Sequence, residues 1–256
     1  MGAGKADYSE IAQIYDEVRR DDLPHIAWWV AKIAAEGRLG PGRRLIDLGC
    51  GTGRWTLPLA KRTGCEAVGL DNCLEMLAKA RAKDTEGRVS WIQDDCENLQ
   101  LDGETFDCAL MSLMMHHLDD HLRTFRGVLR ILRPGGVFLI RQGTLEGILR
   151  DPMHRFFPEI VTVDRRRTPF RSEIEWWLRE AGFDPVSSET FKQHTYATNM
   201  RLLEEIEKRV ASALRIISDE AYQAGVTSLK AHLRRHTDDP SLRDSLFTLF
   251  VARRPG

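Results

Sequence analysis

The sequence lacks long apolar runs, an excess of either charge and a regular cysteine pattern. No apolar run approaches the ~18 residues of a membrane-spanning helix, and the first residues, MGAGKADYSE, contain no apolar stretch typical of a signal peptide. Lysine and arginine total 37 against 38 aspartates and glutamates, which disfavours a non-specific nucleic-acid binder. The five cysteines are odd in number and form no CxxC pair, which argues against disulfides or structural zinc. These absences predict a reduced cytoplasmic protein without a membrane partner.

The composition is that of a globular protein, with 42% hydrophobic and 29% charged residues. We expect a single domain over residues 1–256. Apolar runs predict strands over 44–48, 65–70, 88–92, 106–111 and 137–140, and helical patterns between them cover 56–63, 74–83 and 120–132. Strands that alternate with helices predict an α/β fold with a parallel sheet and helices on both faces.

The second half of the sequence is less regular. Residues 143–170 read as a loop-rich insert, 172–181 as a helix, 185–191 as a strand, 199–236 as strongly helical and 246–251 as a last strand. Such a long helical connection before the last strand is unusual. We therefore expect a helical cap, formed by 1–36, 143–170 and 199–236, over a core of about 38–142, 171–198 and 243–254. A capped pocket suits a small molecule better than a polymer.

The most informative motif is the glycine loop Leu45-Ile-Asp-Leu-Gly-Cys-Gly-Thr-Gly53. Its glycines follow a predicted strand, where they permit a sharp turn and close approach of the backbone to a ligand. The spacing is GxGxG rather than the GxGxxG of dinucleotide-binding enzymes. Asp47, two residues before the first glycine, would repel a pyrophosphate but suits a ligand with an ammonium group. An NAD-dependent enzyme is therefore disfavoured.

Two acidic segments follow this loop. Asp71 ends the second predicted strand about 20 residues later, where a carboxylate can accept hydrogen bonds from two ribose hydroxyls. The alternative is that Asp71 caps the helix that begins after Asn72. After the third strand, the segment Asp94-Asp-Cys-Glu-Asn-Leu99 offers carboxylates for an exocyclic amine and backbone N–H groups for a ring nitrogen.

Together with FDCALMSLMMHHL and LRPGG, these motifs resemble a class I S-adenosylmethionine (SAM)-dependent methyltransferase with a core of methyltransferase type 11 or 25. They occur in family order over 44–142, and EIEWWLREAGF continues the resemblance to 183. The resemblance implies a Rossmann-like sheet of seven strands, the last antiparallel, and SAM as the cofactor with S-adenosylhomocysteine as its product.

The resemblance also implies the residues that bind the cofactor. Asp47 and the loop residues Gly49, Cys50, Gly51 and Gly53 would hold the methionine part of SAM. Asp71 would bind the ribose, with Asn72 beside it, and Asp95 and Cys96 would bind the adenine. Ser112, at the end of the fourth strand, completes the core set. In the N-terminal segment YDEVR, Tyr15 and Arg19 resemble residues that close over SAM, and Arg19 would pair with the SAM carboxylate.

The end of the fourth strand should face the transferring methyl group, because ligands of open α/β sheets bind at the carboxyl ends of strands. Methyl transfer mainly requires alignment, and a general base helps only for a hydroxyl or a protonated amine. His116 and His117 are the candidates for a base or for positioning the acceptor; the alternative is a packing role at the helix entry. We expect no metal, because Asp119 or Asp120, beside His121, is better explained as a helix cap.

These patterns predict a SAM-dependent methyltransferase that acts on a small-molecule acceptor at oxygen, nitrogen or carbon. The alternatives are a tRNA-modifying methyltransferase of similar core, which the balanced charge disfavours, and a non-catalytic SAM-binding protein. The absence of an Asn/Asp-Pro-Pro-Tyr/Phe segment argues against methylation of exocyclic amines of DNA bases. The sequence does not rank the polar cap candidates Gln142, His154, Arg155, His194, Tyr196 and Arg209, and it predicts neither the acceptor nor the oligomeric state.

Overall fold

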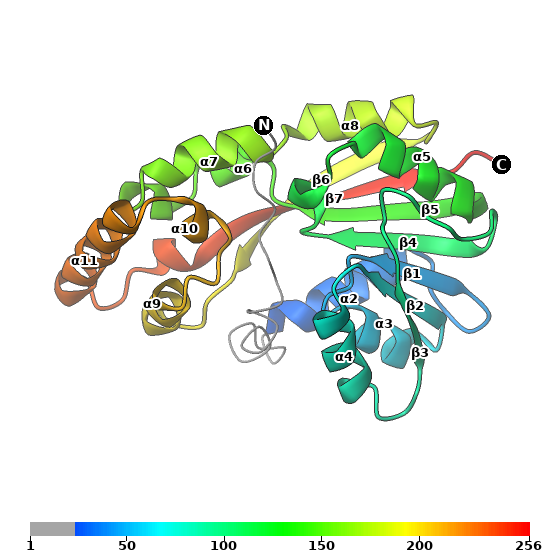
Figure 1. Cartoon of the computed structure of the whole chain (residues 1–256), viewed down its shortest axis with the longest axis horizontal. Coiled ribbons are helices and arrows are strands. Elements are labelled where there is room, and N and C mark those ends of the chain that lie inside the picture. Colours follow the sequence, from blue (N-terminus) through cyan, green and yellow to red (C-terminus); the bar gives the residue numbers. More distant parts are fainter. Residues whose placement is uncertain (1–23) are drawn as a thin grey trace.

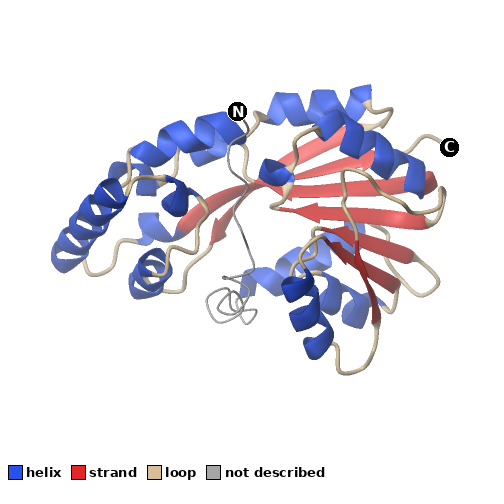
Figure 2. Cartoon of the chain, viewed as in Figure 1, coloured by secondary structure: helices blue, strands red, loops and turns tan. Residues whose placement is uncertain are grey.

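The computed structural model describes residues 24–256, so Tyr15 and Arg19 lie outside the described residues. Within that range a seven-stranded sheet has the order β3-β2-β1-β4-β5-β7-β6 (Figures 1 and 2). The strands are β1 (Arg44–Leu48), β2 (Glu66–Asp71), β3 (Val89–Gln93), β4 (Phe106–Ser112), β5 (Leu132–Gln142), β6 (Val186–His194) and β7 (Asp244–Arg253). Strands β1 to β5 pair in parallel, and β7 is antiparallel to both β5 and β6. The predicted fold class is confirmed.

Helices cover both faces of the sheet. On one face lie α5 (His121–Ile131) and α8 (Arg171–Glu180), and on the other lie α2 (Pro24–Glu36), α3 (Thr56–Thr63) and α4 (Leu74–Lys83) (Figure 1). Each face has its own buried cluster, represented by Phe125 with Phe138 on the first and by Trp29 with Leu139 on the second. Alternate residues of β5 therefore enter opposite clusters, as expected for a strand buried on both faces.

The cap forms a third cluster with a core of its own. Its helices are α6 (Leu145–Ile148), α7 (Glu159–Arg167), α9 (Asn199–Glu207), α10 (Ala213–Ile216) and α11 (Asp219–Arg235), joined by 3₁₀ turns at Pro152–Arg155 and Pro240–Arg243. Phe157, Leu202, Leu214 and Leu229 are buried together there. A side chain at Gly225 of α11 would meet the Phe157 ring at 2.2 Å, so glycine is needed where α11 approaches it.

Two expectations about the cap need correction. Residues 143–170 are not mainly loop, because α7 forms there and is held by burial of Ile160 within the cap cluster. Helix α2 does not belong to the cap either. Its apolar stripe, which includes Trp29 and Ile33, packs against the sheet, and this burial fixes it to the core.

Strand boundaries also differ from the prediction where pairing is long-range. Strand β5 begins five residues early and includes Pro134-Gly135-Gly136, because Gly135 N–H donates to Arg254 O at 3.0 Å. Strands β6 and β7 pair without interruption from Val186 opposite Ala252 to His194 opposite Asp244. This extension carries both strands past the edge of the other strands and into the base of the cap (Figure 2).

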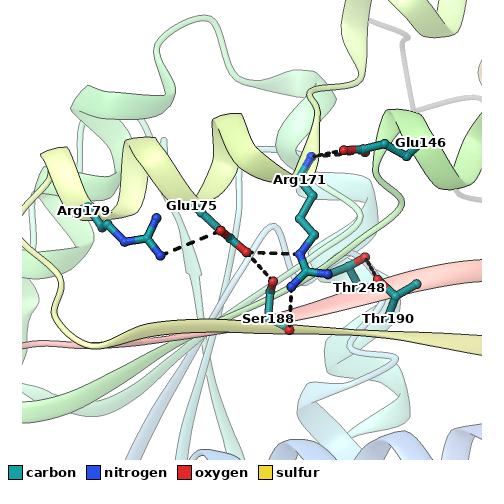
Figure 3. A network of polar contacts seen from close by, with 7 residues as sticks. All are labelled: Glu146, Arg171, Glu175, Arg179, Ser188, Thr190 and Thr248. Carbon is teal, nitrogen blue, oxygen red and sulfur yellow. Dashed lines mark hydrogen bonds and ion pairs between the residues drawn. The ribbon is translucent and has the colours of Figure 1, made fainter.

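A polar network ties the start of the cap to the core (Figure 3). Arg171 N–H donates to both carboxylate oxygens of Glu146 in α6, each at 3.2 Å. The Arg171 guanidinium donates to Glu175 at 3.1 Å and to Ser188 O of β6 at 3.0 Å. The Ser188 hydroxyl donates to Glu175 at 2.5 Å. These contacts join α6, α8 and β6, so the chain enters the cap from a fixed point.

Candidate active site

A cavity of about 1220 Å³ opens at the carboxyl ends of the central strands and continues beneath the cap. It is larger than the ~300–1000 Å³ of a typical small-molecule site, so it has room for a cofactor and a second molecule. Its core wall includes Gly49, Cys50, Gly51, Asp71, Asn72, Asp95, Cys96, Ser112, His116 and His117. Its cap wall includes Ile148, Arg150, Asp164, Arg167, Tyr196, Arg201 and Ser212.

The glycine loop shapes the end of this cavity where the sequence predicts the cofactor, here called the cofactor end. Gly49, Gly51 and Gly53 have φ angles of 69°, 55° and 77°, a left-handed region that favours glycine. A Cβ on Gly49 would lie 2.4 Å from Met114 Cγ, whereas a Cβ on Gly51 would have no neighbour within 4 Å. Gly51 therefore leaves open space at the cavity wall, where the backbone can approach a ligand.

Asp71 connects the loop to the next helix. Its Oδ2 accepts from Gly51 N–H at 2.8 Å and its Oδ1 accepts from Cys73 N–H at 2.9 Å. Burial raises the pKa of Asp71. The carboxylate also lines the cavity beside Asn72, so it can stabilise the turn and still offer lone pairs to a ribose. Both interpretations of Asp71 are compatible with this geometry, and the ribose contact remains a prediction.

Asp47 and Gly53 lie behind the loop and are not among the described residues that line the cavity. Asp47 is buried, and its Oδ2 accepts from Thr56 Oγ1 at 2.5 Å. Burial raises the pKa of Asp47 to about 7. A Cβ on Gly53 would meet the Trp91 ring at 2.6 Å. This placement gives Asp47 a role in fixing the loop against α3, and it argues against the direct ligand contact that we expected.

The segment after β3 forms the predicted adenine wall. Asp95 and Cys96 line the cavity, and Asp95 Oδ1 accepts from Glu97 N–H at 3.0 Å. Burial, followed by the charge of Asp95, raises the pKa of the Cys96 thiol to about 12. Burial likewise raises the pKa of Cys50. Neither thiol is a thiolate at neutral pH, so neither provides a nucleophile.

His116 and His117 occupy a 3₁₀ turn, Met115–His117, directly after β4, and both line the cavity. Their ring centroids are 4.0 Å apart. Asp120 caps α5 by accepting from Arg123 N–H at 2.9 Å, as the helix-cap interpretation predicted. His121 stacks on Trp177, with ring centroids 4.3 Å apart. Within residues 24–256 no group of three His, Cys, Asp or Glu side chains is placed to hold a metal ion.

The cavity wall around Arg141 was not predicted from the sequence. Arg141, at the end of β5, is only 3% exposed, and its Nη2 donates to Gln193 Oε1 at 2.9 Å. Its Cζ lies 3.9 Å from the centre of the Phe247 ring. Burial, followed by the charges of Arg54 and Arg141, lowers the pKa of His25 to about 4, so this imidazole is neutral at neutral pH. The sequence offers one signal for this wall, because Arg141 is a charged residue at the end of an apolar strand.

The structure separates the six polar cap candidates. Gln142 and Tyr196 line the cavity. His154, Arg155, His194 and Arg209 are not among the described residues of its wall. His154 Nε2 instead lies 3.2 Å from Asp164 Oδ2, and His194 Nδ1 lies 2.5 Å from Asp244 Oδ1. The Arg209 guanidinium lies over the Tyr222 ring at 3.8 Å. These three side chains hold the cap and its base together.

Comparisons with known proteins identify methyltransferases as the proteins that this chain resembles. A family described as "Methyltransferase domain" matches residues 46–140. A 27-O-demethylrifamycin SV methyltransferase from Amycolatopsis mediterranei is 26% identical over 274 residues, which cover 97% of this chain and 95% of that protein.

Two solved structures are similar in fold. Phosphoethanolamine N-methyltransferase 2 from Haemonchus contortus, in complex with phosphomonomethylethanolamine and S-adenosylhomocysteine, gives a TM-score of 0.69 at 22% identity, over 98% of this chain and 59% of that chain. A protein from Anabaena variabilis, provisionally assigned as a methyltransferase of an antibiotic biosynthesis pathway, gives a TM-score of 0.74 at 19% identity. The match covers 88% of this chain and 96% of that chain.

The chain is a class I SAM-dependent methyltransferase with SAM as its cofactor. The predictions of family, enzyme class and cofactor are confirmed. The open space at Gly51 and the hydroxyl of Ser112, a buried oxygen with no hydrogen-bond partner among residues 24–256, fit a ligand in this part of the cavity. The residue assignments stay predictions.

No helix among the described residues has the length and apolar character to span a bilayer.

Proposed function

We propose that this methyltransferase methylates a small molecule, at oxygen, nitrogen or carbon, inside the cavity between the strand ends and the cap. The observation that carries the proposal is the continuity of that cavity. It joins Gly51 and Asp71 of the cofactor end to His116 and His117 after β4 and to Arg167 of the cap. Donor and acceptor can therefore meet in one continuous cavity.

The cofactor end would hold SAM through groups on three neighbouring strands. The backbone of Gly49, Cys50 and Gly51 with Ser112 would hold the methionine part, and Asp71 with Asn72 the ribose. Asp95 and Cys96 would hold the adenine. Asp47 and Gly53 act here through the shape of the loop. Tyr15 and Arg19, outside the described residues, are proposed to close over this end.

When bound, SAM supplies an electrophilic methyl group on a sulfonium sulfur. The chain's own contribution is to align the acceptor with that methyl group and to exclude water. His116 or His117 accepts a proton if the acceptor is a hydroxyl or an ammonium, or else positions the acceptor. Cys50 and Cys96 provide no nucleophile, because burial raises the pKa values of both thiols.

Three observations support a small-molecule acceptor over tRNA. The cavity lies between the strand ends and the cap, and a concave pocket admits a small ligand more readily than a polymer. The charges of the chain balance at -1, which offers no excess of cations for phosphates. A relative aligned over 97% of this chain is named for the small molecule demethylrifamycin SV.

The test combines binding with turnover. Calorimetry should show binding of S-adenosylhomocysteine and none of NAD. Incubation with SAM and a panel of phenols, amines and quinols should release S-adenosylhomocysteine with at least one acceptor. Binding of NAD without a response to S-adenosylhomocysteine would refute the cofactor site. Cofactor binding without turnover on small molecules, but with turnover on tRNA, would favour the tRNA alternative; turnover on neither would favour a non-catalytic role.

A further inference from the structure

Gln142 is a buried polar side chain in the cavity wall that the fold does not satisfy. It ends β5 and is 3% exposed. Its Oε1 has no hydrogen-bond partner among residues 24–256. A buried amide oxygen without a partner costs folding free energy, because the oxygen gives up its bonds to water. The chain keeps this group where an apolar residue of the same size would be more stable.

Gln193, on β6, is a glutamine in the same cavity whose side-chain oxygen has hydrogen-bond partners. It is 7% exposed and also lines the wall. Its Oε1 accepts from Trp29 Nε1 at 2.7 Å and from Arg141 Nη2 at 2.9 Å. Gln193 thus fixes the wall itself, whereas Gln142 has no comparable task within the described fold.

The strand order places Gln142 at the acceptor side. Strand β5 is separated from the glycine loop on β1 by β4, and neighbouring strands lie ~4.8 Å apart. Gln142 is therefore about two strand spacings from the loop that would hold the methionine part. The side chain is also one position beyond Arg141, which pairs with Ser112 of β4. A ligand that contacts Gln142 would therefore lie over β5, on the far side of β4 from the glycine loop.

We infer that Gln142 is a positioning residue that binds a hydroxyl group of the methyl acceptor; this inference rests on the proposed function. A carboxamide accepts through its oxygen and donates through its nitrogen. A hydroxyl group is both a donor and an acceptor, so it satisfies the amide whichever end faces it. A site built to bond a hydroxyl discriminates strongly against analogues that lack it, since the protein group is then left buried and unpaired.

The first test compares the two glutamines by thermal unfolding. Gln142→Met removes an unsatisfied polar group at nearly constant volume, and the melting temperature should stay level or rise by about 2–4 °C. Gln193→Met breaks the bonds from Trp29 and Arg141, and the melting temperature should fall. A fall of equal size in both variants would mean that Gln142 serves the fold, and would overturn the inference.

The second test measures hydroxyl recognition with a probe pair, 2-naphthol and 2-methoxynaphthalene, on the protein saturated with S-adenosylhomocysteine. The wild-type protein should bind 2-naphthol at least ~10-fold more tightly. Gln142→Met should reduce this preference to within ~3-fold and leave the affinity for S-adenosylhomocysteine unchanged. Gln223→Met, at an exposed glutamine of α11, should keep the preference.

Absence of a preference in the wild-type protein, or its persistence in Gln142→Met, would overturn the role of Gln142 while leaving cofactor binding intact. Loss of S-adenosylhomocysteine binding by the wild-type protein would instead refute the proposed function, so the two failures are distinguishable.

Discussion

The cofactor end and the cap end of the cavity are held by different kinds of bond. At the cofactor end, carboxylates accept from backbone N–H groups: Asp71 from Gly51 and Cys73, and Glu97 from Asp119 and Asp120 at 2.8 Å each. At the cap end, the contacts around Asp164 join one side chain to another.

Asp164 of α7 is the centre of the cap-end contacts. It lies 3.2 Å from His154 and 3.2 Å from Arg167, and Arg167 donates to Ser212 at 2.8 Å. Backbone donors are the same for nearly every residue type, so these contacts tolerate a change of side chain at Cys73 and Asp119, whereas Gly51 is restricted by its positive φ. The shape of the cap end depends on which side chains are present, so the proposed acceptor site can vary there by substitution.

Removal of the cap should give the largest effect and tests whether the cofactor end stands alone. Because His194 lies opposite Asp244, an Asn-Gly turn can replace residues 195–243. Phe156, Phe157 and Ile160 would be changed to serine, since they lose their cover. We expect turnover to be lost and the Kd for S-adenosylhomocysteine, measured by calorimetry, to stay within ~10-fold. Retained turnover would show that the cap does not form the acceptor site.

Substitutions at His116 test the part of the cavity where the cofactor end meets the cap end. If it accepts a proton, His116→Ala should lower kcat by roughly 10²–10⁴ on the acceptor that the panel identifies, with SAM affinity nearly unchanged. His116→Gln should restore little, because an amide does not take up the proton. His117→Ala is measured alongside, because His117 is the other candidate base in the same turn. Substantial rescue by glutamine would assign positioning to His116, and wild-type rates in both variants would make it structural.

Asp47 tests how firmly the loop at the cofactor end is held. Its folded pKa is about 7 against a usual 3.8, because of burial. The folded state therefore binds more protons than the unfolded state between these values, and stability should fall as pH rises from about 4 to 7. Asp47→Asn should remove this loss, worth up to ~4 kcal/mol above pH 7. Denaturant unfolding at several pH values checks it, with exposed Asp102→Asn as control; an unchanged pH profile would contradict it.

Asp71→Ala should give the smallest of these effects, and it tests the cofactor end alone. Loss of charge-assisted bonds to the ribose, with partial compensation by water, should weaken binding of S-adenosylhomocysteine by ~2–4 kcal/mol. Asp84→Ala is a matched control, because Asp84 also accepts two backbone N–H groups, from Arg88 and Val89, but lies away from the cavity. Equal Kd values for Asp71→Ala and the wild-type protein in calorimetry would refute the ribose contact.

Local patterns predicted the sheet well, and most of the residues expected to bind the cofactor line the cavity, while their contacts with SAM stay predictions. The strand that leads to Gly49 and the carboxylate at Asp71 are recognisable because each depends on neighbours within about 20 residues. The start of β5 was missed because Gly135, which reads as a stop, bonds to Arg254 at the other end of the chain. Helix α7 was missed because Pro158 and the arginines up to Arg167 resemble a solvated turn, and its stability comes from burial in the cap.

The cavity wall around Arg141 was not predictable in the same way. Arg141 is held by Gln193 and Phe247, and His25 is kept neutral by burial and by Arg54 with Arg141. These residues come from α2, the glycine loop, β5, β6 and β7, and no spacing in the sequence relates them. Gln142 was among the polar candidates, but only the lack of a partner for its Oε1 distinguishes it from Gln193.

Because the ends of β6 and β7 are paired, a change in the length of the cap between them costs little entropy. His194 and Asp244 are held opposite each other by the sheet, so the intervening chain begins and ends at neighbouring points whatever its length. The entropy of closing such a loop grows only with the logarithm of its length, by about 0.6 kcal/mol for each doubling. Segments of very different size can therefore be inserted at this point with little loss of stability, and a new acceptor range can arise by insertion as well as by substitution.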